Sequence, residues 1–365
     1  MSDSDFVRGL AAIGLRDRPL AGGKGASLGE LTGAGFRVPP GYVVTTLAFE
    51  RALQALHPGG AAGEIRRDVE RLSSDDHAGI TRVTAAIRER IEAAPLPAGL
   101  RGAIEDHYRR LCAPAGDRPV AVRSSTTSED GADASFAGLQ DTYLWVRGPA
   151  AVADHIRRCW ASLYSVESVT YRRRLGLPEE PLAMGVVVQR MVDPRCSGVM
   201  FTRSPTTGDR SVVCVEASWG VGSAIVSGDV TPDIYVVSKV TGEIIKRAVA
   251  AKLHQHRMAA DGSGIRTQEV PAHLQTRACL GDDEVHALAR IARRIEEHYG
   301  TPQDIEWAIS ADSDDLPRVP AEERIFLLQS RPETVWANRD AAPVAVPRRK
   351  AFDHVLDALG KGFSS

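Results

Sequence analysis

The sequence of 365 residues predicts a mixed α/β (α+β) fold built from two lobes. Apolar runs typical of strands alternate with helical periodicities in both halves, which argues for helices packed on sheets in each half. A polar, glycine-containing segment also follows the apolar run at residues 120–122, where a ligand-binding loop is expected. We expect an N-terminal lobe at residues 1–190, a C-terminal lobe at 191–335, and a linker with a short helix at 336–365.

The first lobe is expected to begin with a helix and a strand and to continue through a long helical region. A helix is predicted over residues 26–31, with Leu28 and Leu31 facing inward. Prolines and a glycine mark a turn that leads into a strand within residues 36–45. Apolar residues then recur every three or four positions over residues 47–111, which predicts helices with solvated charged faces.

Later elements alternate between helix and strand. A long amphipathic helix is predicted over residues 149–175, and its basic end at 172–174 is expected to be solvated. A continuous apolar strand follows at 184–192. Further strands are expected at 199–202, 212–215, 233–238, 243–247, 304–310 and 324–329, with a hairpin turn at Thr241 and Gly242 and a helix at 282–299.

Composition excludes several classes of protein. The formal net charge of −2 gives no general attraction to nucleic acid or acidic membranes, and no basic stripe with interleaved aromatic residues is present. No apolar stretch reaches membrane-spanning length. The five cysteines are scattered without a CxxC pair, which indicates free thiols in a reducing cytosol. We therefore expect a cytoplasmic protein with no nucleic-acid or membrane partner. His254 and His256 lack a third ligand and are interpreted as surface residues.

The segment after residue 122 has the composition of a phosphate-binding loop. Arg123 is expected to emerge at the end of the strand 120–122, and residues 124–128 offer hydroxyl and backbone donors with little bulk. Gly131 and Gly138 allow close approach to a ligand. An ordinary polar surface loop, with Arg123 in a structural salt bridge, is the alternative.

Lys24 lies between glycines, in the sequence Gly22-Gly23-Lys24-Gly25. This spacing does not match a Walker loop, so a P-loop fold is disfavoured. Flanking glycines favour a lysine that approaches a ligand closely, and a surface lysine on a turn is the alternative.

Two strands near the C-terminal end carry candidate metal and phosphate ligands. Alternation places Glu306 on the opposite face from Ile305 and Trp307, and Gln329 and Arg331 follow the next strand. A carboxylate and a carboxamide on adjacent strand ends can bind magnesium through oxygen, and Arg331 can stabilise charge on a transferring group. The alternative for Glu306 is an exposed acid paired with lysine or arginine.

An apolar run at residues 186–188 precedes Gln189 and Met191. An apolar slot that ends in an amide and free backbone groups suits adenine, which needs stacking and a few directed hydrogen bonds. A strand end with a solvated glutamine is the alternative.

These segments together resemble the nucleotide-binding domain of the phosphoenolpyruvate synthase and pyruvate phosphate dikinase family, which includes rifampicin phosphotransferases. Besides residues 120–146, the resemblance is carried in the family's order by AGGKGASLGEL (21–31), PPGYVVTT (39–46), VVVQRMV (186–192), SGVMFTRSP (197–205), EASWGVGS (216–223), IEWAI (305–309) and LLQSRPET (327–334). One departure is Ser223, where many relatives have a glutamate, so no ligand contact is assigned there.

The resemblance implies an ATP-grasp fold with ATP and Mg²⁺ held between the lobes, and a loop at residues 124–141 that closes over the triphosphate. It implies catalytic phosphate contacts from Lys24, Arg123 and Arg331. It also implies nucleotide contacts from Gly138, Thr142, Gln189 and Met191, and from Glu306 and Gln329 as metal ligands.

The implied reaction moves a phosphoryl group, the β-phosphoryl by analogy, to a histidine on a swivelling domain or partner and leaves AMP and phosphate. His286, His298 and His354 lie on charged helical stretches that do not match the family's histidine block. A phosphohistidine-domain protein and an acceptor-binding subunit for a small molecule are therefore expected. The chain is either a separate subunit, as in phenylphosphate synthase, or an excised domain. The alternatives are an ATP-grasp ligase that activates a carboxylate with ADP release, and a non-catalytic nucleotide-binding module.

Overall fold

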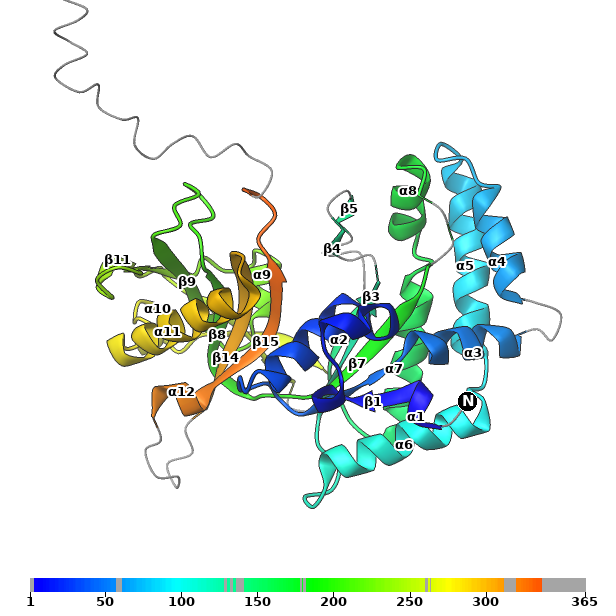
Figure 1. Ribbon diagram of the computed structural model, residues 1–365, viewed down its shortest axis with the longest axis horizontal. Helices are drawn as coiled ribbons and strands as arrows, with labels where there is room; N and C mark the ends of the chain where they lie inside the picture. The colour runs from blue at the N-terminus through cyan, green and yellow to red at the C-terminus, as the bar shows by residue number, and fades with distance from the viewer. Residues whose placement is uncertain are drawn as a thin grey trace, which may run out of the picture.

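The computed structural model describes residues 3–56, 61–127, 130–131, 134–135, 141–177, 179, 182–259, 262, 264–311 and 320–336. Within these residues, two larger antiparallel sheets lie side by side, each with helices packed on it (Figure 1). The helix α2 (Arg18–Gly33) lies between them and contacts strands of both. The predicted mixed α/β fold is confirmed.

The sheet of the N-terminal lobe has the strand order β1-β2-β7-β3-β6. Its strands are β1 (Val7–Gly9), β2 (Gly41–Val44), β3 (Val120–Thr126), β6 (Thr142–Val146) and β7 (Met184–Arg190). Central β7 is apolar and buried almost throughout, because both faces of the sheet are covered. Val186 faces the main helical core, whereas its neighbour Val187 faces α2. The α2 side is also the side that faces the second lobe.

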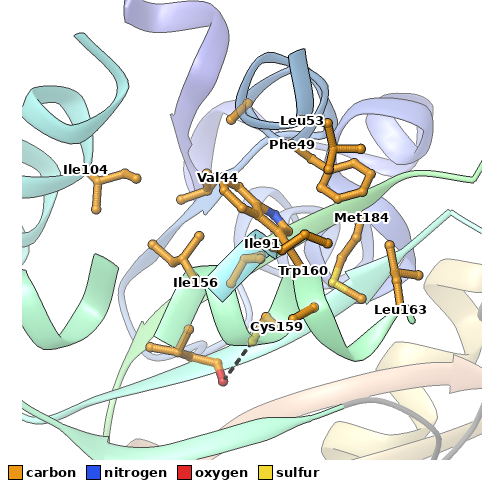
Figure 2. Packing of buried hydrophobic residues seen from close by; sticks show 14 of the residues in the cluster. Val44, Phe49, Leu53, Ile91, Ile104, Ile156, Cys159, Trp160, Leu163 and Met184 are labelled. Carbon is orange, nitrogen blue, oxygen red and sulfur yellow. Dashed lines mark hydrogen bonds between the residues drawn. The ribbon is translucent and has the colours of Figure 1, made fainter. Parts of the chain in front are cut away.

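The region predicted as helical over residues 47–111 is confirmed as a succession of separate helices. The helices of this lobe include α3 (Thr46–Leu56), α4 (Ala61–Glu70), α5 (His77–Ala93), α6 (Ala98–Cys112), α7 (Pro149–Ser162) and α8 (Val166–Arg174). Trp160 of α7 packs against Phe49 of α3 with ring centroids 5.9 Å apart, at the centre of the core shown in Figure 2. The helix predicted over 149–175 is interrupted before Ser165, whose side chain accepts a hydrogen bond from the backbone of Ser168 and caps α8.

The expectation that residues 172–174 form a solvated helix end is wrong for Arg172. Its side chain is only 1 % exposed and forms a bidentate ion pair with Glu179, which is equally buried, at 3.1 Å. Arg172 also donates to the carbonyl of Leu163. A buried guanidinium requires such acceptors, and the sequence spacing did not reveal them.

The sheet of the C-terminal lobe has the strand order β11-β10-β9-β8-β14-β15. Its strands are β8 (Pro194–Phe201), β9 (Val212–Trp219), β10 (Asp233–Ser238), β11 (Ile244–Ala248), β14 (Gln303–Ser310) and β15 (Ile325–Pro332). The predicted hairpin between β10 and β11 is confirmed, and α11 (Asp282–Tyr299) has the predicted bounds. Trp307 and the apolar face of α11 form the core on one side, which leaves the other face of the sheet to the first lobe.

Shorter elements complete the described chain. They are α1 (Asp3–Phe6), η1 (Leu10–Ala12), η2 (Leu15–Asp17), β4 (Asp130–Gly131), β5 (Ala134–Ser135), α9 (Ser223–Val226), β12 (His254–Met258), β13 (Ile265–Glu269), α10 (Ala272–Gln275) and α12 (Ala321–Arg324). The side chain of His256 forms a hydrogen bond with Ser223 at 2.8 Å and is mostly buried. The expectation that His256 is a surface residue is therefore wrong. The five cysteines are free and buried. Among the described helices, none is long and apolar enough to cross a membrane.

The helix α2 belongs to both lobes. Leu28 packs in the small core against the first sheet, as predicted, whereas Leu31 is buried in the core of the second lobe. Ser27 donates a hydrogen bond to the carbonyl of Ser330 on β15 at 2.6 Å. Just after α2, the carbonyl of Arg37 accepts from the backbone of Leu327. The predicted boundary at residue 190 lies between β7 and β8; the domain limits stay a prediction, because residues 337–365 lie outside the described part.

Substitution of Gly22 should disrupt the bend at the start of α2. Gly22 has φ +71°, and an added Cβ would lie 1.9 Å from the carbonyl oxygen of Ser125. We expect Gly22→Ala to lower the free energy of unfolding by about 2–4 kcal/mol, from backbone strain and overpacking together. Gly33→Ala is the control, since a Cβ there meets nothing within 4 Å. Urea denaturation of both variants is the measurement, and equal stability of the two would contradict this account.

A fully buried ion pair in the second lobe provides another test. Lys252 and Asp233 are both 0 % exposed and lie 2.5 Å apart, and Asp233 also accepts from the backbone of Ala250 and Cys279. Lys252→Met leaves a buried carboxylate without its countercharge, so we expect a loss of about 3–5 kcal/mol. Arg290→Met breaks an exposed pair with Glu322 and should cost about 0–1 kcal/mol in the same thermal or urea unfolding experiment.

Candidate active site between the lobes

Arg123 joins the two sheets. Its guanidinium donates to the carbonyl of Leu328 at 2.6 Å, to Oε1 of Gln329 at 2.8 Å and to Oε2 of Glu306 at 3.4 Å. The side chain is buried although it carries a permanent charge, which is tolerated because these acceptors surround it. The structure thus brings together three of the residues that the sequence assigned to one site.

The sequence suggested that Arg123 ends its strand, and this expectation is wrong. β3 continues to Thr126 in register with β7, and Arg123 lies opposite Val187 of β7 on one side and Thr142 of β6 on the other. Ser124, Ser125 and Thr126 are therefore buried strand residues rather than donors of a mobile loop. Half of the expected loop, Gly138 included, lies outside the described residues.

The face of the first sheet that carries Arg123 also carries other predicted residues. Residues directly opposite in a sheet share a face, so Thr142 lies beside Arg123. Gln189 lies two positions along the neighbouring strand, opposite Ala121. The Gln189 amide donates to the carbonyl of Pro39 at 3.1 Å, and the backbone of Met191 donates to Pro119. The adenine-side assignment of Gln189 and Met191 stays a prediction, and both already have hydrogen-bond partners within the protein.

The facing wall is the open face of the second sheet. Glu306 on β14 lies opposite Gln329 on β15, and Ile305 and Trp307 point into the core, so the predicted alternation is confirmed. On the other side of β14, Glu306 lies opposite Val199 of β8, and Val199 lies opposite Glu216 of β9. These residues therefore lie on the same face of the sheet. Burial raises the pKa of Glu216 above its ordinary value, which favours its neutral form.

Asp304 and Arg331 form a second pair on the same face of this sheet. They are register partners, and Arg331 Nε lies 3.5 Å from Asp304 Oδ2. Burial raises the pKa of Asp304 to about 6, with Arg331 opposing the shift and Glu333 adding to it. Asp304 is not among the site residues that the sequence predicts. Its position two residues before Glu306 on a strand was the signal, because such residues share a face.

Lys24 lies on the segment of α2 that is bonded to β3. The backbone N–H of Gly25 donates to the hydroxyl of Ser125 at 2.9 Å, so the backbone of Lys24 is held next to the strand that carries Arg123. Burial and the Asp141 carboxylate raise the pKa of the Cys159 thiol beneath this strand, and the charge of Lys24 opposes that rise. The charge of Lys24 therefore acts on the neighbourhood of this strand.

The oxygen atoms of Glu306 and Gln329 suit a magnesium ion whose remaining ligands are phosphate and water. The Glu306 carboxylate and the Gln329 carboxamide present oxygens to the same point, as their shared contact with Arg123 shows. Among the described residues, no cluster of three or more His, Cys, Asp or Glu could hold a metal alone. Magnesium commonly keeps one or two protein ligands and completes its octahedron with phosphate and water.

Comparison with known proteins identifies the family. The model of the pyruvate phosphate dikinase AMP/ATP-binding domain matches residues 18–351. A probable phosphoenolpyruvate synthase of Methanothermobacter thermautotrophicus is 41% identical over 331 residues, which is 90% of this chain and 46% of that protein. A rifampicin phosphotransferase of a Streptomyces species is 43% identical over 90% of this chain and 35% of its own length.

The phosphoenolpyruvate synthase of Aeropyrum pernix is 39% identical over 90% of this chain and 42% of its own length. This chain therefore spans between about a third and a half of the length of these three relatives. The match includes every residue that the structure places at the interface between the two sheets. The chain belongs to the family of pyruvate phosphate dikinase AMP/ATP-binding domains.

Proposed function

We propose that this chain binds Mg²⁺ and ATP between its two lobes, as an ATP-grasp domain, and takes part in ATP-dependent phosphoryl transfer. The observation that carries this proposal is the contact of Arg123, from the first sheet, with Glu306 and Gln329 of the second. Cations and hard oxygen ligands on facing walls are what a magnesium nucleotide requires. The family of the chain supports the same function.

In this proposal, Lys24 and Arg123 bind phosphate oxygens from the first lobe, and Arg331 binds them from the second. Arg331 is 46 % exposed at its side chain, so it can reach a ligand while Asp304 orients it. Arg123 can exchange its present acceptors for phosphate, since a guanidinium suits both. Thr142, Gly138, Gln189 and Met191 complete the nucleotide contacts.

Glu306 and Gln329 hold the metal. When bound, the metal neutralises charge on the phosphate oxygens and fixes their orientation. The surrounding residues position the reacting groups in line, and positioning with charge stabilisation supplies most of the acceleration in phosphoryl transfer.

The acceptor in this proposal is a histidine of a separate swivelling domain or partner subunit. Its ring nitrogen attacks the β-phosphorus, AMP leaves, and water then removes the outer phosphate, so that phosphohistidine and inorganic phosphate result. The phosphoryl group then passes to a small-molecule acceptor on a further domain or subunit. The length of the relatives, two to three times the matched region, supports a need for such additional domains. The buried free thiols support a reducing, cytoplasmic location.

Removal of one metal ligand should weaken nucleotide binding without unfolding the chain. Glu306→Gln keeps the size of the side chain but removes the charge that attracts the metal. We expect the affinity for Mg-ATP in isothermal calorimetry, and for Mn²⁺-ATP in electron paramagnetic resonance, to fall about tenfold or more. Glu323→Gln, an exposed acid on α12, is the control. Equal affinity in both variants would rule out Glu306 as a ligand.

The nucleotide product separates the proposed reaction from its alternatives. With Mg-ATP and a protein that carries the acceptor histidine, we expect AMP and phosphate by phosphorus NMR. ADP formed with a carboxylate substrate would instead indicate a ligase, and bound but unchanged ATP would indicate a non-catalytic module. Arg331→Met should slow AMP formation by about 10²–10³-fold, as loss of a charge-stabilising donor does. Arg293→Met, an exposed arginine of α11, should not.

A further inference from the structure

The hydroxyl of Ser125 bonds the start of α2 to the central sheet. It donates to the carbonyl of Ala21 at 2.8 Å and accepts from the backbone N–H of Gly25 at 2.9 Å. Ser125 and both of its partners are buried, so water cannot replace either bond. These two bonds enclose the segment 21–25, which contains Lys24.

The backbone around this contact is tightly packed. A Cβ on Gly22 would lie 1.9 Å from the Ser125 carbonyl oxygen, and one on Gly185 would lie 2.8 Å from the Ala21 carbonyl oxygen. Gly185 is the register partner of Ser125 on β7. Two glycines therefore let the bend of α2 lie directly on the β3-β7 pair, and the Ser125 hydroxyl fixes its position there.

Ser125 is also tied to Arg123 through the strand. Residues two apart on a strand share a face, so both side chains point to the side of the sheet that α2 covers. Lys24 directly precedes Gly25, whose N–H is bound by the Ser125 hydroxyl. A single strand segment thus determines where the Lys24 backbone lies relative to Arg123.

We propose that Ser125 is a positioning residue that sets the spacing between Lys24 and Arg123, the two phosphate-binding cations of the first lobe. This role rests on the proposed function, because it concerns how the phosphates of ATP are bound. Ser125 does not touch the nucleotide; it acts through Lys24.

Ser124 provides a matched control on the same strand. It is as fully buried as Ser125, but its hydroxyl points to the helical core and has no hydrogen-bond partner among the described residues. Both substitutions, Ser124→Ala and Ser125→Ala, remove one buried hydroxyl oxygen from β3. Only the second removes two hydrogen bonds.

Calorimetric binding of ATP and of adenosine to the full chain tests this role. We expect Ser125→Ala to weaken ATP binding about tenfold and to leave adenosine binding unchanged, because only the phosphates meet Lys24. Ser124→Ala should match the wild type with both ligands. Ser125→Cys, which retains a weaker donor and acceptor, should give an intermediate ATP affinity. Equal loss of ATP and adenosine affinity in Ser125→Ala would show general damage and overturn the proposal.

A double-mutant cycle tests whether Ser125 acts through Lys24. In a Lys24→Met background, Ser125→Ala should cause little further loss of ATP affinity, whereas additive losses would contradict the proposed route. Hydrogen exchange without nucleotide gives a separate readout: Ser125→Ala, but not Ser124→Ala, should speed amide exchange at Gly25. If the wild-type chain binds no ATP, the proposed function fails and this role fails with it. If it binds ATP and Ser125→Ala binds equally well, the positioning role alone fails.

Discussion

A charged guanidinium buried between two lobes imposes the main constraint on this molecule. Arg123 must keep hydrogen-bond acceptors wherever it lies, because an unpaired buried charge is far more costly than a paired one. Its acceptors, the Leu328 carbonyl with Gln329 and Glu306, all come from the other lobe. The facing walls are therefore held close together by groups that a magnesium nucleotide would also use. The same chemistry that closes the interface makes it suitable for phosphate.

The helix α2 explains how two separately packed sheets form one site. One part of the helix contributes Leu28 to the core against the first sheet, and a later turn contributes Leu31 to the core of the second lobe. The bend at Gly22 and the Ser125 hydroxyl fix its beginning, while Ser27 and the carbonyl of Ser330 fix its later part. The glycines of the Lys24 segment are thus required for close backbone packing as well as for access to a ligand. One short segment serves both needs.

Sequence patterns predicted helices and strands correctly where the apolar residues recur with one regular spacing. The helix at residues 282–299 and the outward side of Glu306 followed from apolar spacing alone. Patterns failed where a distant partner decided the outcome. Polar Ser124, Ser125 and Thr126 continue a strand because β7 pairs with them. Arg172 can be buried because Glu179 pairs with it. The pKa of Asp304 is raised because its side chain is buried in the folded protein. The sequence of residues 302–306 alone does not predict this burial. The sequence blocks singled out Arg123, Glu306 and Gln329, which meet in the structure, but not the Ser125 hydroxyl that bonds to Ala21 and Gly25.

The five cysteines described above are all buried, four of them in the cores of the two lobes, and burial raises the pKa of the thiols of Cys159, Cys196, Cys214 and Cys279. A thiol that is both inaccessible and protonated reacts slowly with maleimides, since the thiolate is the nucleophile. The native chain should therefore react only slowly with maleimides. A single cysteine introduced on the outer surface of each lobe would take a fluorophore selectively, so that the distance between the lobes could be followed in solution by energy transfer without first removing a native residue.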